Sequence, residues 1–338
     1  MTSELIKAYH HIYQHFDKEN NGQQHSNKSK IVNFIAKTEP ATLYELKKFH
    51  TNTYIETLKN NPEQILNETS FASTENSSLI NYCQQVVGAS IAAADELINT
   101  DCRISICWYG GWHHAKSDGY SGFCFVNDCV FAINRLLPSF HKVLYIDLDI
   151  HHGDGVEQAF LGHENVLTFS AHKRCPGFFP GSGEDTSILL DSDFHNKSVN
   201  LEFSTNCDPM IWQTSIIQKF DSILSSFQFD AILLLCGADT LKHDPLGDGF
   251  KVELKHYIAV VTYILAAKLP TLLLGGGGYN PASAARLWTC LTLLSIESDN
   301  DSGKILNKLP NTIPNEYVTE YFLKYAPSYS LTELDKCE

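Results

Sequence analysis

The chain has 338 residues, of which 43% are hydrophobic and 19% charged, which is typical of a globular protein and excludes a disordered or fibrous one. A formal net charge of −14 argues against direct binding to nucleic acid, which needs concentrated lysine and arginine, and suits a cationic partner. The longest apolar runs are too short to span a bilayer and the N-terminus lacks a signal pattern, so we expect an intracellular protein with no membrane partner, whose ten cysteines, without a CxxC pair, are reduced.

The first hundred residues predict mainly helices. We expect helices at 5–16, 28–35 and 43–58, then a polar surface loop at 61–78 and an Ala-rich helix at 79–97. From residue 100 onward, apolar strand runs alternate with helical segments. The predicted strands are 104–108, 143–150, 166–169, 198–201, 231–235 and 271–274, and the helices between or after them are 127–137, 211–226, 252–267 and 282–295. This alternation predicts one parallel sheet with helices on both faces, in a single domain over residues 1–338 without a linker.

The most informative segment is 143–155, where an apolar strand ends in a cluster of carboxylates and imidazoles. The two-residue period of a strand puts Asp147, Asp149 and His151 on one face, and buried carboxylates are tolerated only when they are paired with a cation or hydrogen-bonded. An Asp-x-His spacing suits Zn²⁺ or Fe²⁺. A salt-bridged strand end is the alternative, but three carboxylates and two histidines within eight residues favour a metal.

Further polar residues follow other predicted strands. Asp239 would complete a set of two carboxylates and one imidazole, which leaves a coordination position open as catalytic zinc sites do. The adjacent His113 and His114 would point apart in an extended segment, and the nearby Asp147 and Asp154 are candidate partners that orient one imidazole each.

Two loops suit a substrate pocket. The glycines at 275–278 lack the lysine of a phosphate-binding loop, so we interpret them as a turn that allows close approach and lets the Tyr279 phenol donate to a developing oxyanion. Phe123 and the pair Phe178-Phe179 lie on glycine- and proline-rich segments, which favours walls of an apolar channel over ordinary core positions.

Six sequence blocks together resemble the class I zinc-dependent histone deacetylases, in the order and spacing of that family. They are Gly-Gly-Trp-His-His-Ala-Lys at 110–116, Ser-Gly-Phe-Cys-Phe-Val-Asn-Asp at 121–128, Asp-Leu-Asp-Ile-His-His-Gly-Asp-Gly at 147–155, Pro-Gly-Phe-Phe-Pro-Gly at 176–181, Gly-Ala-Asp-Thr-Leu at 237–241 and Gly-Gly-Gly-Gly-Tyr-Asn at 275–280. The similarity runs from about residue 28 to residue 327.

The resemblance implies an arginase–deacetylase α/β fold with about eight strands, and hydrolysis of acetyl-lysine amides in histone tails or other proteins of the nucleus or cytoplasm. By this resemblance, zinc would be bound by Asp149, His151 and Asp239, and a K⁺ ion by Asp147, Asp149, His151, Ser170 and Ala171. The catalytic groups would be His114 as general base with Asp154, His113 with Asp147, and Tyr279 on the acetyl carbonyl. The lysine channel would be lined by Gly122, Phe123, Phe179 and Leu246.

The chain departs from the family at several positions. A gapless match places Ala72 where the family has a substrate-gripping rim aspartate, with Glu68 or Glu75 as candidate replacements. Lys28 is the residue nearest to a missing N-terminal arginine. Pro245 and Ala282 replace two arginines that hold inositol phosphate in corepressor-bound relatives, so we expect no corepressor that depends on inositol phosphate.

Three other functions share features with these residues. A binuclear manganese ureohydrolase of the arginase type would need a second Asp-x-Asp, which residues 237–240 do not supply. A polyamine or other small-molecule deacetylase would have the same metal site. A scaffold that binds acetyl-lysine with little turnover is supported by the lost rim aspartate, whereas the presence of Tyr279, His113 and His114 argues against it.

Overall fold

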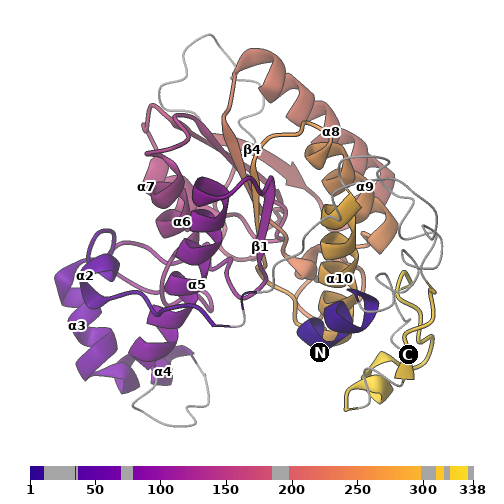
Figure 1. Ribbon diagram of the computed structural model, residues 1–338, viewed down its shortest axis with the longest axis horizontal. Coiled ribbons are helices and arrows are strands. Elements are labelled where there is room, and N and C mark those ends of the chain that lie inside the picture. The colour runs from indigo at the N-terminus through magenta and orange to yellow at the C-terminus, as the bar shows by residue number, and fades with distance from the viewer. Residues whose placement is uncertain are drawn as a thin grey trace.

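A computed structural model describes residues 1–10, 35, 37–69, 79–184, 198–297, 310–315 and 320–333, without the side chains of 66–69 and 297. The predicted α/β fold is confirmed: six parallel strands form one sheet in the order β1-β6-β5-β2-β3-β4 (Figure 1). The strands are β1 (Ile104–Cys107), β2 (Val143–Asp147), β3 (Val166–Lys173), β4 (Ser198–Phe203), β5 (Ala231–Leu235) and β6 (Thr271–Leu274). The described residues thus contain six strands, which equals the number of apolar runs predicted from the sequence. The family resemblance had implied about eight.

Helices cover both faces of the sheet (Figure 1). One layer contains α5 (Leu79–Asn99), α6 (Asp128–Leu136) and α7 (Asp154–Phe160), and the other contains α8 (Pro209–Ser226), α9 (Leu254–Leu265) and α10 (Pro281–Glu297). The short helix α7 was not predicted, because we interpreted its first residue, Asp154, only as part of the polar strand end. The other five lie within a few residues of their predicted bounds.

The alternation of side chains along the strands explains the two-sided core. In β2, Leu144 and Ile146 pack in the cluster of α8 to α10, whereas Val143 and Tyr145 pack in the cluster of α5 to α7. Because both faces are buried, the strands read as continuous apolar runs instead of alternating polar and apolar residues.

The strand order places a switch in direction at the centre of the sheet. The chain runs from β2 outward to β3 and β4, then returns to the other side of β2, where β5 pairs with it in the register Asp147 opposite Leu235. Connections that leave in opposite directions open a crevice at the carboxyl ends of the strands, where α/β proteins bind ligands. The loops after β2 and β5 carry Asp149 and Asp239 to this crevice.

The helices before α5 differ from the prediction. Instead of one helix over 43–58, the chain forms α2 (Leu43–Leu46) and α3 (Asn52–Asn60), because Thr51 begins a new helix by accepting a hydrogen bond from the Tyr54 N–H at its side-chain oxygen. The predicted loop at 61–78 is wrong in its first part, where α4 (Pro62–Thr69) forms. Proline is favoured as the first residue of a helix, where its missing N–H is not needed.

The N-terminal helix and the C-terminal segment meet on α10. Residues 2–10 are helical, and their Leu5 and Tyr9 pack with Ala285 of α10 and with Tyr325 of the 3₁₀ helix η3 (Phe322–Tyr325). The predicted helix 28–35, with Lys28, lies outside the described residues except for residue 35, which is not helical. The rim loop with Ala72 and Glu75 and the end of the predicted helix 5–16 also lie outside them. The Glu68 side chain is likewise not described.

Reduced cysteines and the absence of a membrane span were both predicted, and both can be checked in the part of the chain that the structure describes. All nine cysteines that it contains are free thiols. None of its helices has the length and apolar character needed to cross a bilayer.

Candidate active site

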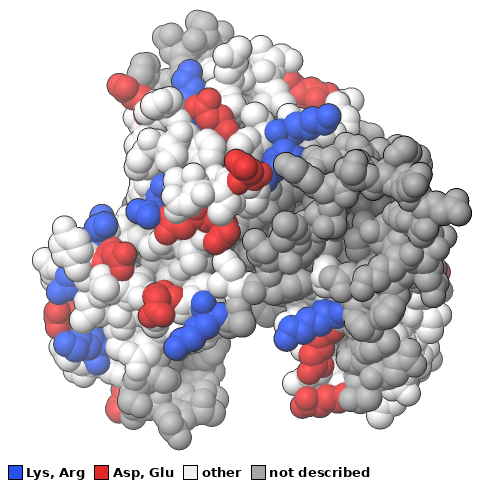
Figure 2. All heavy atoms as spheres, in the orientation of Figure 1, with Lys and Arg blue, Asp and Glu red and all other residues white. Residues whose placement is uncertain are grey.

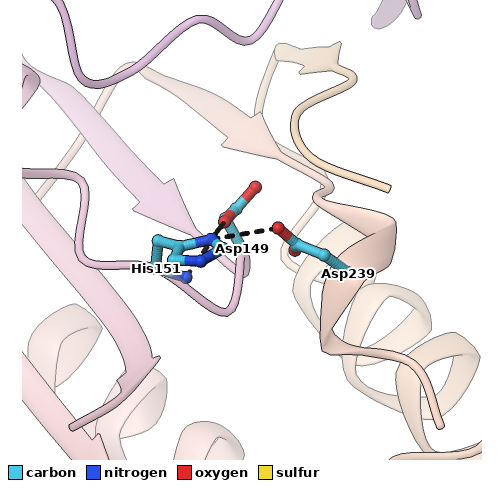
Figure 3. A group of neighbouring side chains, drawn as sticks. All are labelled: Asp149, His151 and Asp239. Atoms are coloured by element: carbon cyan, nitrogen blue, oxygen red, sulfur yellow. Dashed lines mark hydrogen bonds and ion pairs between the residues drawn. The ribbon is translucent and has the colours of Figure 1, made fainter. Parts of the chain in front are cut away.

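The three predicted metal ligands converge beyond the carboxyl ends of β2 and β5 (Figure 3). Asp149 and His151 come from the loop after β2, and Asp239 comes from the 3₁₀ helix η1 (Ala238–Thr240) after β5. His151 Nδ1 lies 3.1 Å from Asp149 Oδ1 and 3.1 Å from Asp239 Oδ2, and one ligand atom from each residue lies within 4.8 Å of the others. Two carboxylates and one imidazole, all buried, form a donor set that suits a divalent ion such as zinc.

The charges of the two carboxylates depend on each other. Burial opposes ionisation of Asp149, but His113 and His151 outweigh it and lower the pKa of that carboxyl. Burial, together with the Asp149 charge, raises the pKa of Asp239. A divalent cation between them would remove this conflict, because it favours ionisation of both.

Backbone hydrogen bonds hold the ligands in place. Strand β2 ends at Asp147 and not at residue 150, because Asp147 Oδ1 accepts the Asp149 N–H at 3.0 Å and turns the chain. Asp239 Oδ1 accepts the Ile150 N–H at 3.1 Å, and Asp149 Oδ2 accepts the Gly277 N–H at 2.7 Å. The carboxylates are thus oriented by the protein itself, as a preorganised site requires.

The glycine run after β6 allows a close approach to these ligands. A Cβ atom at Gly277 would lie 2.0 Å from Asp239 Oδ2, and one at Gly276, which has a φ of +129°, would lie 3.1 Å from Asp149 Oδ2. A side chain at either position would therefore push the loop away from the carboxylates. The run packs the Tyr279 loop directly against the ligands.

Two histidine–carboxylate pairs lie beside the ligand group. His113 Nδ1 is 2.7 Å from Asp147 Oδ2, and His114 Nδ1 is 2.7 Å from Asp154 Oδ1. The expectation that adjacent histidines point apart is wrong, since their Nε2 atoms are only 3.0 Å apart. The segment is a loop and not a strand, so the alternation of a strand does not apply.

The two imidazoles differ in charge. Burial opposes protonation of His113, but the carboxylates of Asp147 and Asp149 outweigh it and raise its pKa to about 9. Burial and the neighbouring His113 cation lower the pKa of His114 to about 3. Cationic His113 then donates from Nδ1 to Asp147 and from Nε2 to His114, while neutral His114 donates from Nδ1 to Asp154 and accepts at Nε2. His114 is the imidazole able to accept a proton.

The start of α6 clamps the histidine loop. The Asp128 carboxylate accepts the Trp112 N–H at 2.7 Å, the Gly111 N–H at 3.0 Å and the Ser90 hydroxyl at 2.5 Å. Asn127 Nδ2 donates to the carbonyl oxygen of His113 at 3.1 Å. Sequence reasoning missed this role, although Asn-Asp directly before a helix is a capping pattern that indicates backbone partners.

Three further residues with a role in the site were also missed. Tyr145 donates its hydroxyl to Asp147 Oδ2 at 2.6 Å, and Lys116 Nζ lies 2.5 Å from Asp154 Oδ2. Asp244 Oδ2 accepts the backbone N–H of Tyr279 at 2.7 Å. For Lys116 the signal was its place in the histidine block, three residues after His113; for Asp244 the sequence offers no clear signal.

Three of the four predicted channel residues, Gly122, Phe123 and Phe179, lie next to His114 or Tyr279. The Phe179 ring contacts the His114 ring at 4.9 Å between centroids, and the Phe123 ring lies 5.5 Å from that of Tyr279. A Cβ at Gly122 would lie 3.0 Å from His114 Cδ2. Phe123, Phe179, Leu246 and Tyr279 are each 37–44% exposed, although all four are large and hydrophobic. Burial and the charges of Asp239 and Asp149 raise the pKa of Tyr279, so its phenol stays protonated.

The residues proposed for a monovalent cation lie on two neighbouring strands. Ser170 and Ala171 belong to β3, and Ser170 pairs with Asp147 in the sheet register. The Ser170 hydroxyl accepts the Gly153 N–H at 3.3 Å and lies 2.9 Å from His172 Nδ1. Asp147 thus ends β2, Asp149 and His151 follow it in the loop, and Ser170 and Ala171 lie within the neighbouring β3.

Comparisons with known proteins agree in pointing to one family. Residues 6–294 match the family described as "Histone deacetylase domain". Histone deacetylase 8 of Xenopus laevis is 37% identical over 271 residues, which cover 78% of this chain and 82% of that protein. Histone deacetylase 8 of Danio rerio is 39% identical over 269 residues (76% and 70%), and histone deacetylase B of Dictyostelium discoideum is 36% identical over 273 residues (78% and 64%).

Proposed function

The chain belongs to the histone deacetylase family, and we propose that it hydrolyses the acetyl amide of N-acetyl-lysine in peptides or proteins, with Asp149, His151 and Asp239 holding a catalytic zinc ion. The observation that supports this proposal most is the convergence of the buried Asp–His–Asp group with two histidine–aspartate pairs and a protonated phenol. When bound, zinc would supply Lewis-acid polarisation of the acetyl carbonyl and would acidify water.

The residues of the chain take the remaining parts of the reaction. Neutral His114, oriented by Asp154, accepts the proton of the attacking water and then delivers it to the departing lysine amine. The Tyr279 phenol donates a hydrogen bond to the acetyl oxygen as negative charge develops there. His113, held cationic by Asp147 and next to His114, contributes positive charge to the site.

The half-exposed apolar residues Phe123, Phe179 and Leu246 suit the aliphatic stem of an acetylated lysine, whose charge has been removed. Among the described residues on the face shown in Figure 2, acidic and basic side chains are interspersed, in keeping with a protein or peptide substrate and no direct nucleic acid partner. We propose histone tails or other acetylated proteins of the nucleus or cytoplasm as substrates.

We further propose K⁺ as a second ion at Asp147, Asp149, His151, Ser170 and Ala171, and activity without inositol phosphate. The latter rests on two positions: Pro245 has no charge to offer, and Ala282 is 9% exposed and packed in the cluster of the N-terminal helix. Titration of inositol hexakisphosphate into a turnover assay should leave the rate unchanged. A saturable activation would contradict this part of the proposal.

One experiment tests the central proposal. Purified protein is assayed on an acetylated histone peptide and on an acetylated polyamine, with and without a chelator, and its metal content is measured by plasma emission together with that of Asp239→Ala. We expect peptide turnover that the chelator abolishes, and loss of metal in the variant because too few ligands remain. Unchanged metal content in Asp239→Ala, or preference for the polyamine, would overturn the metal site or the substrate class.

A further inference from the structure

Strand β3 ends in a lysine whose ammonium group is buried. The Lys173 side chain is 0% exposed, and its Nζ donates to Asp248 Oδ2 at 2.5 Å and to the backbone oxygen of Asp248 at 3.0 Å. A buried ammonium is strongly unfavourable without a counter-charge. Asp248, although 67% exposed, therefore has a fixed place next to the end of β3.

Lys173 also contacts the metal edge of the sheet. Its backbone N–H donates to the carbonyl oxygen of Ile150 at 2.9 Å, between the two ligands Asp149 and His151. Its Nζ lies 4.3 Å from the centroid of the Phe178 ring, a cation–π distance. That ring stacks on His151, with the planes 1° apart and the centroids separated by 5.1 Å. Lys173 thus contacts both the loop and the ring that set the position of His151.

Asp248 belongs to the loop at 241–252, which carries two parts of the substrate site. The loop is closed by the Lys242 N–H donating to the Val252 oxygen at 2.7 Å. Within it, the Asp244 carboxylate accepts the backbone N–H of Tyr279 at 2.7 Å and that of Leu246, the residue proposed for the channel, at 2.9 Å. Asp248 has a φ of +45°, a left-handed conformation that aspartate adopts more readily than most residues other than glycine.

We propose that Lys173 and Asp248 are positioning residues: their ion pair locks the 241–252 loop against the metal edge, so that Asp244 presents Tyr279 and Leu246 closes the channel at a fixed distance from His151. Because removing an ammonium from water is costly, an ion pair whose lysine is buried often adds little stability compared with an apolar side chain of similar size, while it specifies geometry. Lys173→Met should therefore separate positioning from stability. The kinetic part of this inference rests on the proposed deacetylase function.

The test compares Lys173→Met with Lys255→Met, which removes a lysine from an exposed pair with Glu253 on α9. In Lys173→Met we expect an unchanged or higher midpoint of thermal unfolding and full zinc content. Hydrogen exchange of the metal-free protein should become faster over 241–252 and nowhere else. On an acetyl-lysine peptide, kcat should fall and KM rise together, for a loss of about tenfold in kcat/KM, because the loop positions both the phenol and the channel wall. Lys255→Met should match the wild type in every measurement.

Asp248→Asn provides the second arm. It leaves the ammonium buried without its counter-charge, so the unfolding midpoint should fall, and the double variant with Lys173→Met should recover it. Unchanged exchange over 241–252 in Lys173→Met, or kinetics equal to those of Lys255→Met, would overturn the proposal. Faster exchange across the whole sheet with a lower midpoint would also overturn it, because Lys173 would then be a general core residue. A wild-type protein without turnover would count against the proposed function alone, since the exchange measurement uses neither metal nor substrate.

Discussion

Two corners of the active site each contain a histidine paired with an aspartate, but the two histidines differ in charge. The His113 corner is closed: the His113 and Asp147 side chains are 4% and 0% exposed. The His114 corner is more open, with Asp154 15% exposed and also paired with Lys116. Although the histidines are adjacent in sequence, His113 is a cation and His114 is neutral at pH 7. The partners of each carboxylate, and not the histidine itself, decide the charge.

The partners explain the difference physically. Asp147 accepts hydrogen bonds from the Tyr145 hydroxyl and the Asp149 N–H, both neutral donors, so His113 is the cation next to it that balances its charge. Asp154 shares its charge with Lys116, and its pKa is lowered to about 2 against the effect of burial by His114 and Lys116. Once His113 is charged, a second imidazolium 3.0 Å away is unfavourable. His113 is therefore protonated at pH 7, whereas His114 is neutral and can accept a proton.

Removing each imidazole in turn should show the largest difference between the two corners. His114→Ala should lower kcat by about a thousandfold, because general acid–base catalysis contributes on the order of 10²–10⁴ in rate. His113→Ala should lower it at least about tenfold less, since its role is electrostatic. Both rates are measured on an acetyl-lysine peptide with metal content as the control. Equal losses would mean that the two corners do not have different roles.

Tyr279→Phe leaves both corners intact and removes the donor opposite them. We expect retained zinc and a loss in kcat of about a hundred- to a thousandfold, since a missing oxyanion donor costs roughly 3–4 kcal/mol of transition-state stabilisation. The pH profile of the residual activity should keep its wild-type shape. Near-normal turnover would show that the phenol does not contact the acetyl oxygen.

The two carboxylates should differ in their contribution to stability. Asp147→Ala leaves buried His113 and Tyr145 without an acceptor and should lower the free energy of unfolding by about 3 kcal/mol, the lower end for breaking a buried ion pair. Asp154→Ala should lower it by about 1 kcal/mol, because water reaches that corner. Urea unfolding of the metal-free proteins measures both. A larger cost for Asp154 would contradict the description of its corner as the open one.

Lys116→Met should have the smallest effect. Without the ammonium, Asp154 interacts more strongly with His114 and raises the pKa of that imidazole, so protonation inactivates the base at a higher pH. Because the pKa of His114 is about 3 in the wild type, we expect turnover at pH 7 to be unchanged and the acidic limb of the kcat/KM profile to be displaced to higher pH. Lys255→Met is the matched control. A displacement to lower pH would reverse the proposed role of Lys116.

Much of the fold and the metal-ligand group could be predicted from the sequence, because both depend on local patterns of apolar and polar residues. Apolar runs such as 143–147 mark strands buried on both faces, and such strands pair in parallel, so their carboxyl ends gather at one edge. Polar residues that follow them, Asp149 and Asp239 among them, must then lie close together. The six blocks, read as a family resemblance, supplied the roles that periodicity alone leaves open.

Other features were decided only by tertiary structure. The division of residues 43–58 into two helices depends on the Thr51 cap and on His50, whose ring accepts the Asn127 N–H, 77 residues later in the chain. The meeting of His113 and His114 depends on the clamp from Asp128, because an unclamped extended segment would turn them apart.

The charges of the active-site histidines and the contact between Lys173 and Asp248 are likewise decided by tertiary structure. The amino-acid sequence by itself determined which residues face the core and which strand ends carry carboxylates and imidazoles, since local periodicity encodes these. Which carboxylate meets which cation, and therefore which histidine is charged and which loop is locked, depends on pairs 34–75 residues apart in the chain. Only the packed sheet and its loops bring such pairs within hydrogen-bond distance, and burial then makes their charges interact strongly.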